Sequence, residues 1–125
     1  MMIYGIGVDQ VNLNRVRKLL SKSQTKFEKR CFTYNEIIYA NRFNDPAKRL
    51  GARFAAKEAV MKSLGKGWRQ LNWKDIEISG GGKPEVILHG KAKKLASELN
   101  IHDVHVSLSH EEDQAIAFTI SEIEK

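Results

Sequence analysis

The sequence predicts an α+β fold, in which a largely antiparallel sheet packs against one long helix and several short ones. Near both ends of the chain apolar residues alternate with polar ones, as on a strand with one buried face. Between those ends apolar residues recur at every third or fourth position, as on an amphipathic helix. The resulting order of strand, helices, hairpin, helix and hairpin is typical of α+β proteins.

The chain has 125 residues, 42% of them hydrophobic and 29% charged, so we expect one folded domain over residues 1–125. No apolar run approaches the roughly 18 residues that a membrane span needs, and residues 1–9 lack the basic start of a secretion signal. We therefore expect a cytoplasmic protein without a membrane partner. The single cysteine, Cys31, excludes an internal disulfide and a thiolate metal site, but it leaves pairing between chains open.

The charge of the chain is basic, with 21 Lys and Arg against 15 Asp and Glu and a net charge of +6. Such a surface favours an acidic partner, which could be nucleic acid, an anionic membrane, a phosphorylated ligand or an acidic protein. The charge does not select among these partners, and an ordinary soluble surface explains it equally well.

The first strand is predicted over residues 3–11, where Ile, Tyr and Val are mixed with two glycines that allow close backbone contact. It ends near Asp9, and a carboxylate at the end of a strand is a candidate site residue. A short helix follows, because Leu13, Val16 and Leu20 recur at helical spacing. The rest of that helix is a basic surface formed by Arg15, Arg17, Lys18 and Lys22.

Two further helices are predicted in the middle of the chain. A threonine and a glutamate three residues apart form a capping box, which predicts a helix over residues 34–42. Asp45 is placed to cap the next helix, Pro46 suits its first turn, and two glycines follow its end. This helix, over residues 46–64, is the longest element that we predict.

The remainder of the chain predicts two hairpins and a helix between them. Residues 75–79 and 85–89 read as strands joined by a glycine-rich turn. A helix over residues 91–99 turns its lysines towards water. The last two strands, around residues 104–108 and 116–120, are expected to pair through an acidic turn.

The long helix carries the residues best suited to chemistry. Glu58 and Lys62 are four residues apart and share a face, and Arg53 lies in a neighbouring row of cations with Arg49 and Lys57. Mg²⁺ is usually held by one or two carboxylates together with substrate phosphates, and lysine and arginine both bind phosphate. Asp9 and Glu58 could form that carboxylate pair. The alternative is a plain Glu–Lys pair in solvent, and spacing alone does not place Asp9 beside Glu58.

A second candidate is the polar face of the penultimate strand, made of His105, Ser107 and Ser109 and followed by His110. Such a face indicates a pocket or a subunit boundary, or else an edge strand turned to water. A serine hydrolase is disfavoured because the sequence has no G-x-S-x-G elbow. A zinc site is disfavoured because the histidines lack H-E-x-x-H spacing, and residues 80–84 lack the pattern of a phosphate-binding loop.

Five segments of the chain together carry a more specific signal. They are Gly5-Ile6-Gly7-Val8-Asp9, Phe32-Thr33-x-x-Glu36, Arg53-Phe54-Ala55-Ala56-Lys57-Glu58-Ala59-x-x-Lys62, Gly82-Lys83-Pro84 and Val106-Ser107-Leu108-Ser109-His110. In this order and at these separations they resemble the holo-acyl-carrier-protein synthase family of phosphopantetheinyl transferases. The resemblance runs from Tyr4 to about Glu122 and is strongest in the first and third segments.

The resemblance implies a homotrimer of phosphopantetheinyl transferase fold, with active sites in the clefts between subunits. It also implies that Asp9 and Glu58 bind Mg²⁺ with the pyrophosphate of coenzyme A and that Lys62 neutralises phosphate charge. The residues expected to line the cofactor cleft are Arg53, His105, Ser107, Ser109 and His110.

The implied reaction moves 4′-phosphopantetheine from coenzyme A to a serine of an apo-acyl carrier protein, releasing adenosine 3′,5′-bisphosphate, a step in fatty acid biosynthesis. Phosphoryl transfer needs positioning, charge neutralisation and a base, and our hypothesis is that Glu58 takes the serine proton. Carrier proteins are acidic, so the basic first helix would attract them. A nucleic-acid-binding module and a homologue without activity are the competing interpretations, although no nucleic-acid-reading motif is present.

Overall fold

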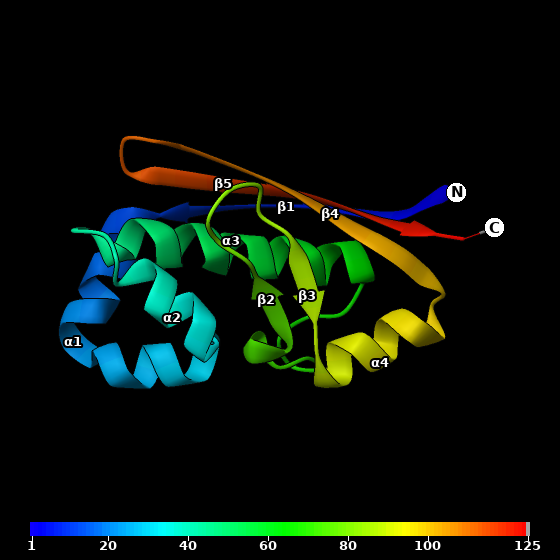
Figure 1. The fold of residues 1–125 in the computed structure, drawn as a ribbon, viewed down its shortest axis with the longest axis horizontal. Helices are drawn as coiled ribbons and strands as arrows, with labels where there is room; N and C mark the ends of the chain where they lie inside the picture. Colours follow the sequence, from blue (N-terminus) through cyan, green and yellow to red (C-terminus); the bar gives the residue numbers. More distant parts are fainter. Residues whose placement is uncertain (125) are drawn as a thin grey trace.

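The computed structural model describes residues 1–124, and its main feature is a three-stranded antiparallel sheet in the order β1 (Met2–Asn12), β5 (Gln114–Ile123) and β4 (Ile101–Glu111). Helix α3 (Pro46–Leu64) runs along one face of this sheet (Figure 1). Strands β1 and β4 are therefore the two edges of the sheet, and each contacts α3. The α+β fold predicted from the sequence is confirmed.

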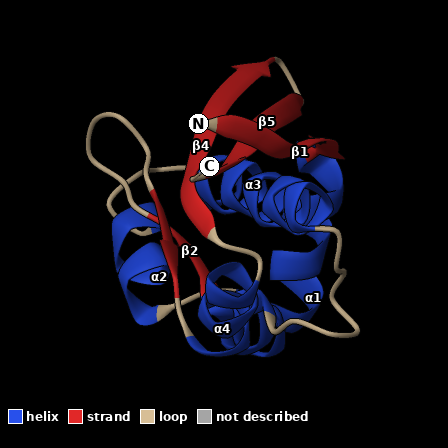
Figure 2. Ribbon diagram, turned by 90° about the vertical axis from the view of Figure 1, so that its right-hand side faces the viewer, coloured by secondary structure: helices blue, strands red, loops and turns tan. Residues whose placement is uncertain are grey.

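The remaining elements cover the side of α3 that faces away from the sheet. Figure 2 shows α3 between the sheet and this second layer. The second layer contains α1 (Leu13–Cys31), α2 (Tyr34–Ala40), a short 3-10 turn η1 (Trp73–Asp75), the hairpin of β2 (Ile76–Ile78) and β3 (Val86–Leu88), and α4 (Gly90–Glu98). Because α3 lies between two layers, most of its residues are buried, including charged ones.

Strand β1 and helix α3 approach each other unusually closely. A Cβ atom added to Gly7 would overlap the carbonyl oxygen of Ala59, and one added to Gly5 would overlap the carbonyl oxygen of Ser63. The hydroxyl of Thr119 on β5 donates a 2.8 Å hydrogen bond to the same carbonyl of Ala59. The sheet thus rests directly on the backbone of α3, and the first half of β1 lies beside the C-terminal half of the helix.

Two details differ from the sequence-based expectations. Helix α1 spans 19 residues, but its backbone leaves helical geometry at Ser23 (φ −151°, ψ 49°), so the short helix that was predicted is followed by a second helical segment that was not. Asp45 does not cap α3 with its side chain. Its carboxylate instead accepts a 2.6 Å hydrogen bond from Arg17, because a charge-assisted bond is stronger than a cap.

The local signals were otherwise reliable. The capping box of α2 is present, with Thr33 and Glu36 each bonded to the other's backbone, and Gly65 ends α3 in the left-handed region at φ 79°. Both predicted hairpins form, although β2 and β3 are only three residues long. Within residues 1–124, no helix has the length and apolar character needed to cross a membrane.

Candidate active site

The first candidate site is formed where Asp9 of β1 meets α3. The strand does not end near Asp9, as the sequence suggested, but continues to Asn12, so Asp9 lies within it. The Nζ atom of Lys62 donates to Asp9 Oδ1 at 3.1 Å and to the carbonyl oxygen of Val8 at 2.8 Å. Next to this ion pair is a cavity of about 310 Å³, which we call the carboxylate pocket. It is lined by Glu58, Met61, Lys62, Gly65, Lys66, Gly67 and Trp68.

Two carboxylates, Glu58 in the lining of the pocket and Asp9 beside it, are the groups at this site that could hold a divalent cation. Burial, and secondly the charge of Asp9, raise the pKa of Glu58, while Lys62 lowers it in part. Lys62 pairs with Asp9, because β1 brings Asp9 within its reach, so the alternative of a plain Glu58–Lys62 pair is not what the structure shows. A pair of carboxylates fits Mg²⁺, which keeps several waters and takes further oxygens from phosphate. No group of three or more protein ligands occurs in the described chain, so the protein alone would not enclose the ion.

A second cavity, of about 430 Å³, lies on the other edge of the sheet, beside β4. We call it the basic cavity, since four of its lining residues are lysine or arginine and none of those described is acidic. It is lined by Tyr39, Lys48, Arg49, Ala52, Arg53, Gly82, Lys83, Pro84, Val106, Ser107, Leu108 and His110.

Arg53 is the most informative residue of the basic cavity. Its side chain is only 5% exposed, and burial lowers its pKa despite the nearby Tyr39 and Glu36. One nitrogen, Nη2, donates to the carbonyl oxygen of Ser79 at 3.2 Å, and the guanidinium lies 4.5 Å from the ring centre of Tyr39. The Nε atom is buried without a hydrogen-bond partner. A desolvated cation with an unsatisfied donor, at the wall of a cationic cavity, favours an anionic ligand.

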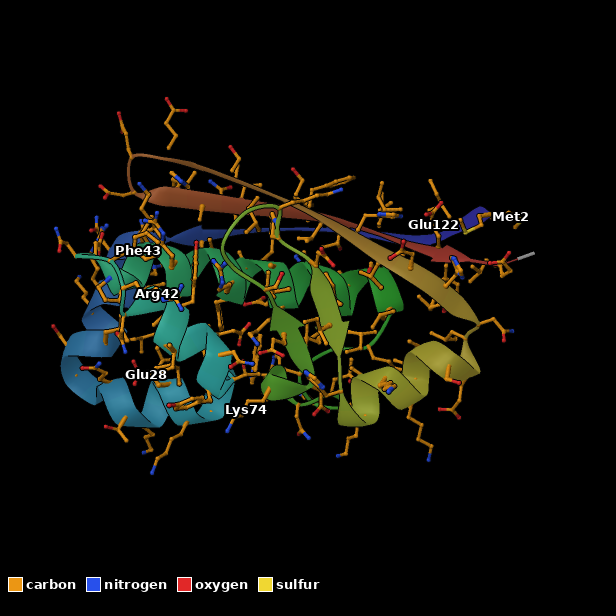
Figure 3. All side chains as sticks on the ribbon, in the orientation of Figure 1. Met2, Glu28, Arg42, Phe43, Lys74 and Glu122 are labelled. Carbon is orange, nitrogen blue, oxygen red and sulfur yellow. The ribbon has the colours of Figure 1, made fainter. Side chains whose placement is uncertain are left out.

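The structure separates the predicted cofactor residues into two groups. Arg53, Ser107 and His110 line the basic cavity together. Ser109 and His105 lie outside it on the exposed part of β4, and His105 Nε2 is 2.5 Å from Glu122 Oε1 on the neighbouring strand. Figure 3 shows Glu122 near Met2, at the end of the sheet where β1 begins. Phe43 lies at the opposite end of the molecule in this view, and the Arg49 guanidinium lies over its ring, 3.7 Å from the ring centre.

Some residues of the two cavities were not singled out as site residues from the sequence. Residues 80–84 were interpreted as a turn, and Gly82-Lys83-Pro84 as part of the family resemblance, but Lys83 and its neighbours also line the basic cavity. The phenol of Tyr39 carried no sequence signal. Lys57 was expected in the row of cations beside Glu58, but it is fully buried on the other side of α3 and pairs with Glu36. Helical spacing could not reveal that partner, because it comes from another helix.

The basic surface of α1 is only partly free. Arg15, Lys18 and Lys22 are exposed. Arg17 is tied to Asp45 at 2.6 Å and to Asp113 at 3.1 Å, so it fastens α1 to its neighbours. At the irregular turn of α1 a mainly apolar groove of about 400 Å³ opens, lined by Leu19, Ser23, Lys26, Phe27, Arg30, Cys31, Phe54, Trp68 and Trp73.

Comparison with known proteins assigns this arrangement to a family. A holo-[acyl-carrier-protein] synthase of Clostridium kluyveri is 45% identical over 126 residues, covering 99% of this chain and 93% of the relative. The crystal structure of the Neisseria meningitidis synthase matches with a TM-score of 0.88 at 37% identity, covering 97% of this chain and 99% of that one. The Helicobacter pylori synthase, solved in complex with coenzyme A, matches with a TM-score of 0.82 at 31% identity, covering 94% and 99%.

The family assignment rests on nearly the whole chain. Residues 5–119 match the 4′-phosphopantetheinyl transferase superfamily, and this range includes both cavities and the basic helix. The resemblance inferred from the five sequence segments is therefore confirmed, and the chain is a transferase. It belongs to the 4′-phosphopantetheinyl transferase superfamily, among the holo-[acyl-carrier-protein] synthases.

Proposed function

We propose that this chain transfers 4′-phosphopantetheine from coenzyme A to a serine of an apo-acyl carrier protein, in a Mg²⁺-dependent reaction that releases adenosine 3′,5′-bisphosphate. The observation that carries the proposal is the meeting of Asp9 and Lys62 beside Glu58, where β1 lies against α3. The relatives are named for this activity, and one was solved with coenzyme A. A cytoplasmic location and a role in fatty acid biosynthesis stay predictions.

In the carboxylate pocket, Asp9 and Glu58 would hold Mg²⁺, which when bound neutralises charge on the pyrophosphate. Lys62 is half-exposed at 54% and lies 3.1 Å from Asp9, so its ammonium group can move from the carboxylate to a phosphate oxygen. Glu58 is the candidate base, because its raised pKa lies closer to neutrality than that of an ordinary glutamate. It would take the proton of the acceptor serine.

The basic cavity suits the second anionic group of coenzyme A. The cofactor carries a pyrophosphate and, separately, a 3′-phosphate on its ribose, so it needs two cationic sites. Arg53, Ser107 and His110 offer a guanidinium, a hydroxyl and an imidazole at the same cavity. We infer that these residues bind the 3′-phosphate end, as arginine does for phosphate in general.

We also propose that the chain forms a homotrimer in which each active site lies between two subunits. The carboxylate pocket and the basic cavity lie at opposite edges of one sheet and share no lining residue. A ring of subunits would bring the β1 edge of one beside the β4 edge of the next. His105 and Ser109 would then line the shared cleft from the exposed side of β4.

The outer face of the sheet supports this assembly. Ile6 and Val8 on β1 are 61% and 54% exposed, and Ile116 and Phe118 on β5 are both 41% exposed. Val8 is paired directly with Phe118, so the four side chains form one apolar patch. A contiguous apolar patch on a sheet face is typical of a protein–protein interface.

The carrier protein would dock on α1. Arg15, Lys18 and Lys22 are free to attract its acidic surface, whereas Arg17 contributes mainly by holding the helix in place. The apolar groove of α1 shares Trp68 with the carboxylate pocket. A carrier bound over α1 and the groove would therefore reach the transfer site with its serine.

The deciding experiment is the mass of a purified apo-acyl carrier protein after incubation with this chain, coenzyme A and Mg²⁺. We expect a gain of one phosphopantetheine group, lost when EDTA is added. No gain with several carrier proteins would refute the proposed activity. The competing nucleic-acid-binding function would then be tested by salt-dependent retardation of unrelated oligonucleotides.

A further inference from the structure

A buried ion pair joins α3 to α2 on the side of α3 that faces away from the sheet. Lys57 and Glu36 are 0% and 1% exposed, and Nζ of the lysine lies 2.7 Å from Oε1 of the glutamate. Two apolar side chains of similar volume would often stabilise a core equally well, because burying charges costs desolvation energy. Stability alone therefore does not explain the pair, and the segments of chain that its two side chains hold in place are the more informative feature.

Both partners of the pair hold the same segment of chain. The Lys57 ammonium donates to the carbonyl oxygens of Trp73, at 3.1 Å, and of Ile76. The second oxygen of Glu36 accepts the backbone N–H of Ile78 at 2.9 Å. Residues 73–78, which include strand β2, are thus fixed from two directions by one pair of charges.

The held segment leads directly into the wall of the basic cavity. Ser79 follows β2, and its carbonyl oxygen accepts the 3.2 Å bond from Arg53 Nη2. The backbone N–H of Ser79 donates to the carbonyl oxygen of Glu85 at 2.9 Å, and its hydroxyl accepts the N–H of Glu85 at 3.0 Å. These bonds close the loop that carries Lys83 to the cavity, so the loop and Arg53 take their places from the end of β2.

Helix α2 contacts the same loop a second time through Tyr39. The ring of this tyrosine lies beneath the Arg53 guanidinium and so close to Gly80 that a Cβ there would come within 2.6 Å of it. Any movement of α2 relative to α3 would therefore be transmitted to the loop and to Arg53.

We propose that the Lys57–Glu36 pair positions the basic cavity: it locks β2 to α2 and α3, and thereby sets Arg53 and the 80–84 loop for the 3′-phosphate of coenzyme A. Neither residue lines the cavity, so both act as positioning residues. The proposal rests on the proposed function of the cavity and adds a pair of residues that take no part in the transfer.

The test uses the double variant Lys57→Met/Glu36→Gln, which removes both charges without leaving one buried alone and keeps an oxygen to accept the Ile78 N–H. We expect the KM for coenzyme A to rise about tenfold, the equivalent of one hydrogen bond to a charged group. The kcat at saturating coenzyme A and the KM for carrier protein should change less than about twofold. The KM for dephospho-coenzyme A, which lacks the 3′-phosphate, should stay as in the unaltered chain.

Leu95→Ala on α4 is the matched control, since it trims a partly buried side chain of the main core away from the hairpin loop. It should lower thermal stability without changing the KM for coenzyme A. The proposal is overturned if the folded double variant keeps its KM, if the KM for dephospho-coenzyme A rises in parallel, or if Leu95→Ala gives the same rise. Should the double variant not fold, Glu36→Gln alone must give a smaller rise of the same selectivity, and an unchanged KM would refute the proposal.

Hydrogen exchange separates this proposal from the proposed function. The amides of Ile78, Ser79 and Glu85 should exchange faster in the double variant than in the Leu95→Ala control. If the unaltered chain transferred no phosphopantetheine, the proposed function would be refuted. The positioning role of the Lys57–Glu36 pair would then be tested by hydrogen exchange alone. Unchanged protection of these amides would then show that the pair positions nothing.

Discussion

The carboxylate pocket and the basic cavity lie on opposite edges of one sheet, yet helix α3 supplies residues to both. At the pocket, Glu58 and the adjacent Asp9 lie beside a lysine that is half-exposed, so the charges can rearrange around a metal and a phosphate. The cavity is built around a buried arginine that Ser79 and Tyr39 hold in place before any ligand arrives. We infer that the pocket performs the chemistry and that the cavity provides affinity.

The largest effect is expected in the carboxylate pocket. Asp9→Asn and Glu58→Gln should each lower kcat/KM by about a thousandfold or more, since each removes charge that faces the reacting phosphate. Neither should weaken binding of adenosine 3′,5′-bisphosphate by more than about threefold, because the 3′-phosphate would be bound in the other cavity. Turnover measurements check the loss of kcat/KM, and calorimetry checks the binding of adenosine 3′,5′-bisphosphate. If Glu58→Gln kept its turnover while Asp9→Asn lost it, Glu58 would not be the base.

The next effect concerns the assembly that is needed to unite the two cavities. Phe118→Glu places a charge in the exposed apolar patch and should dissociate the trimer, lowering activity about a hundredfold because the half-sites separate. Ile38→Glu on α2 is the control, since Ile38 is 41% exposed, as Phe118 is, but lies away from the sheet. Light scattering measures the mass of both variants. A monomeric Phe118→Glu variant with full activity would contradict the shared site.

A smaller and selective effect is expected in the basic cavity. Arg53→Met keeps most of the apolar stem but loses the guanidinium, so the KM for coenzyme A should rise about 10- to 100-fold. The kcat should change little, in contrast to the pocket variants. Steady-state kinetics with coenzyme A and with dephospho-coenzyme A check this. An equal rise for both donors would place Arg53 outside the 3′-phosphate site.

The smallest effect is expected on α1, which contributes to neither cavity. The double variant Arg15→Glu/Lys18→Glu should raise the KM for acyl carrier protein about tenfold, and this rise should be larger at low salt than at high salt. The KM for coenzyme A should not change. The control is Lys93→Glu/Lys94→Glu on α4, which makes the same charge change at two exposed lysines and should leave the KM for acyl carrier protein unchanged. If both substrates lost affinity equally, the docking surface would lie elsewhere.

Local signals in the sequence were sufficient to predict the frame of the molecule. The bounds of α3 follow from Pro46 at one end and Gly65 at the other, and both act within a few residues of the helix. The resemblance added the meeting of Asp9 with the long helix, which spacing alone could not supply. Its physical cause became visible only in three dimensions, where Gly7 allows the strand to touch the helix backbone.

Two failures of prediction involve partners that are distant in sequence. Arg17 was expected to be free and is bound to Asp45, 28 positions away. Lys57 was expected in a row of cations beside Glu58 and is buried against Glu36 of another helix. Helical periodicity predicts which residues share a face but not what that face meets, so these contacts could not be read from the sequence.

The central claim is that the two cavities are halves of one active site, contributed by neighbouring subunits. The direct test mixes Glu58→Gln and Arg53→Met subunits and exchanges them into common trimers by partial unfolding and refolding. Transfer to carrier protein is measured at a coenzyme A concentration well below the KM of the Arg53→Met variant. Each variant alone is impaired, but a mixed trimer contains an interface with an intact Glu58 on one side and an intact Arg53 on the other. We predict that mixing raises activity well above the sum of the separate variants; activity equal to that sum would contradict a site shared between subunits.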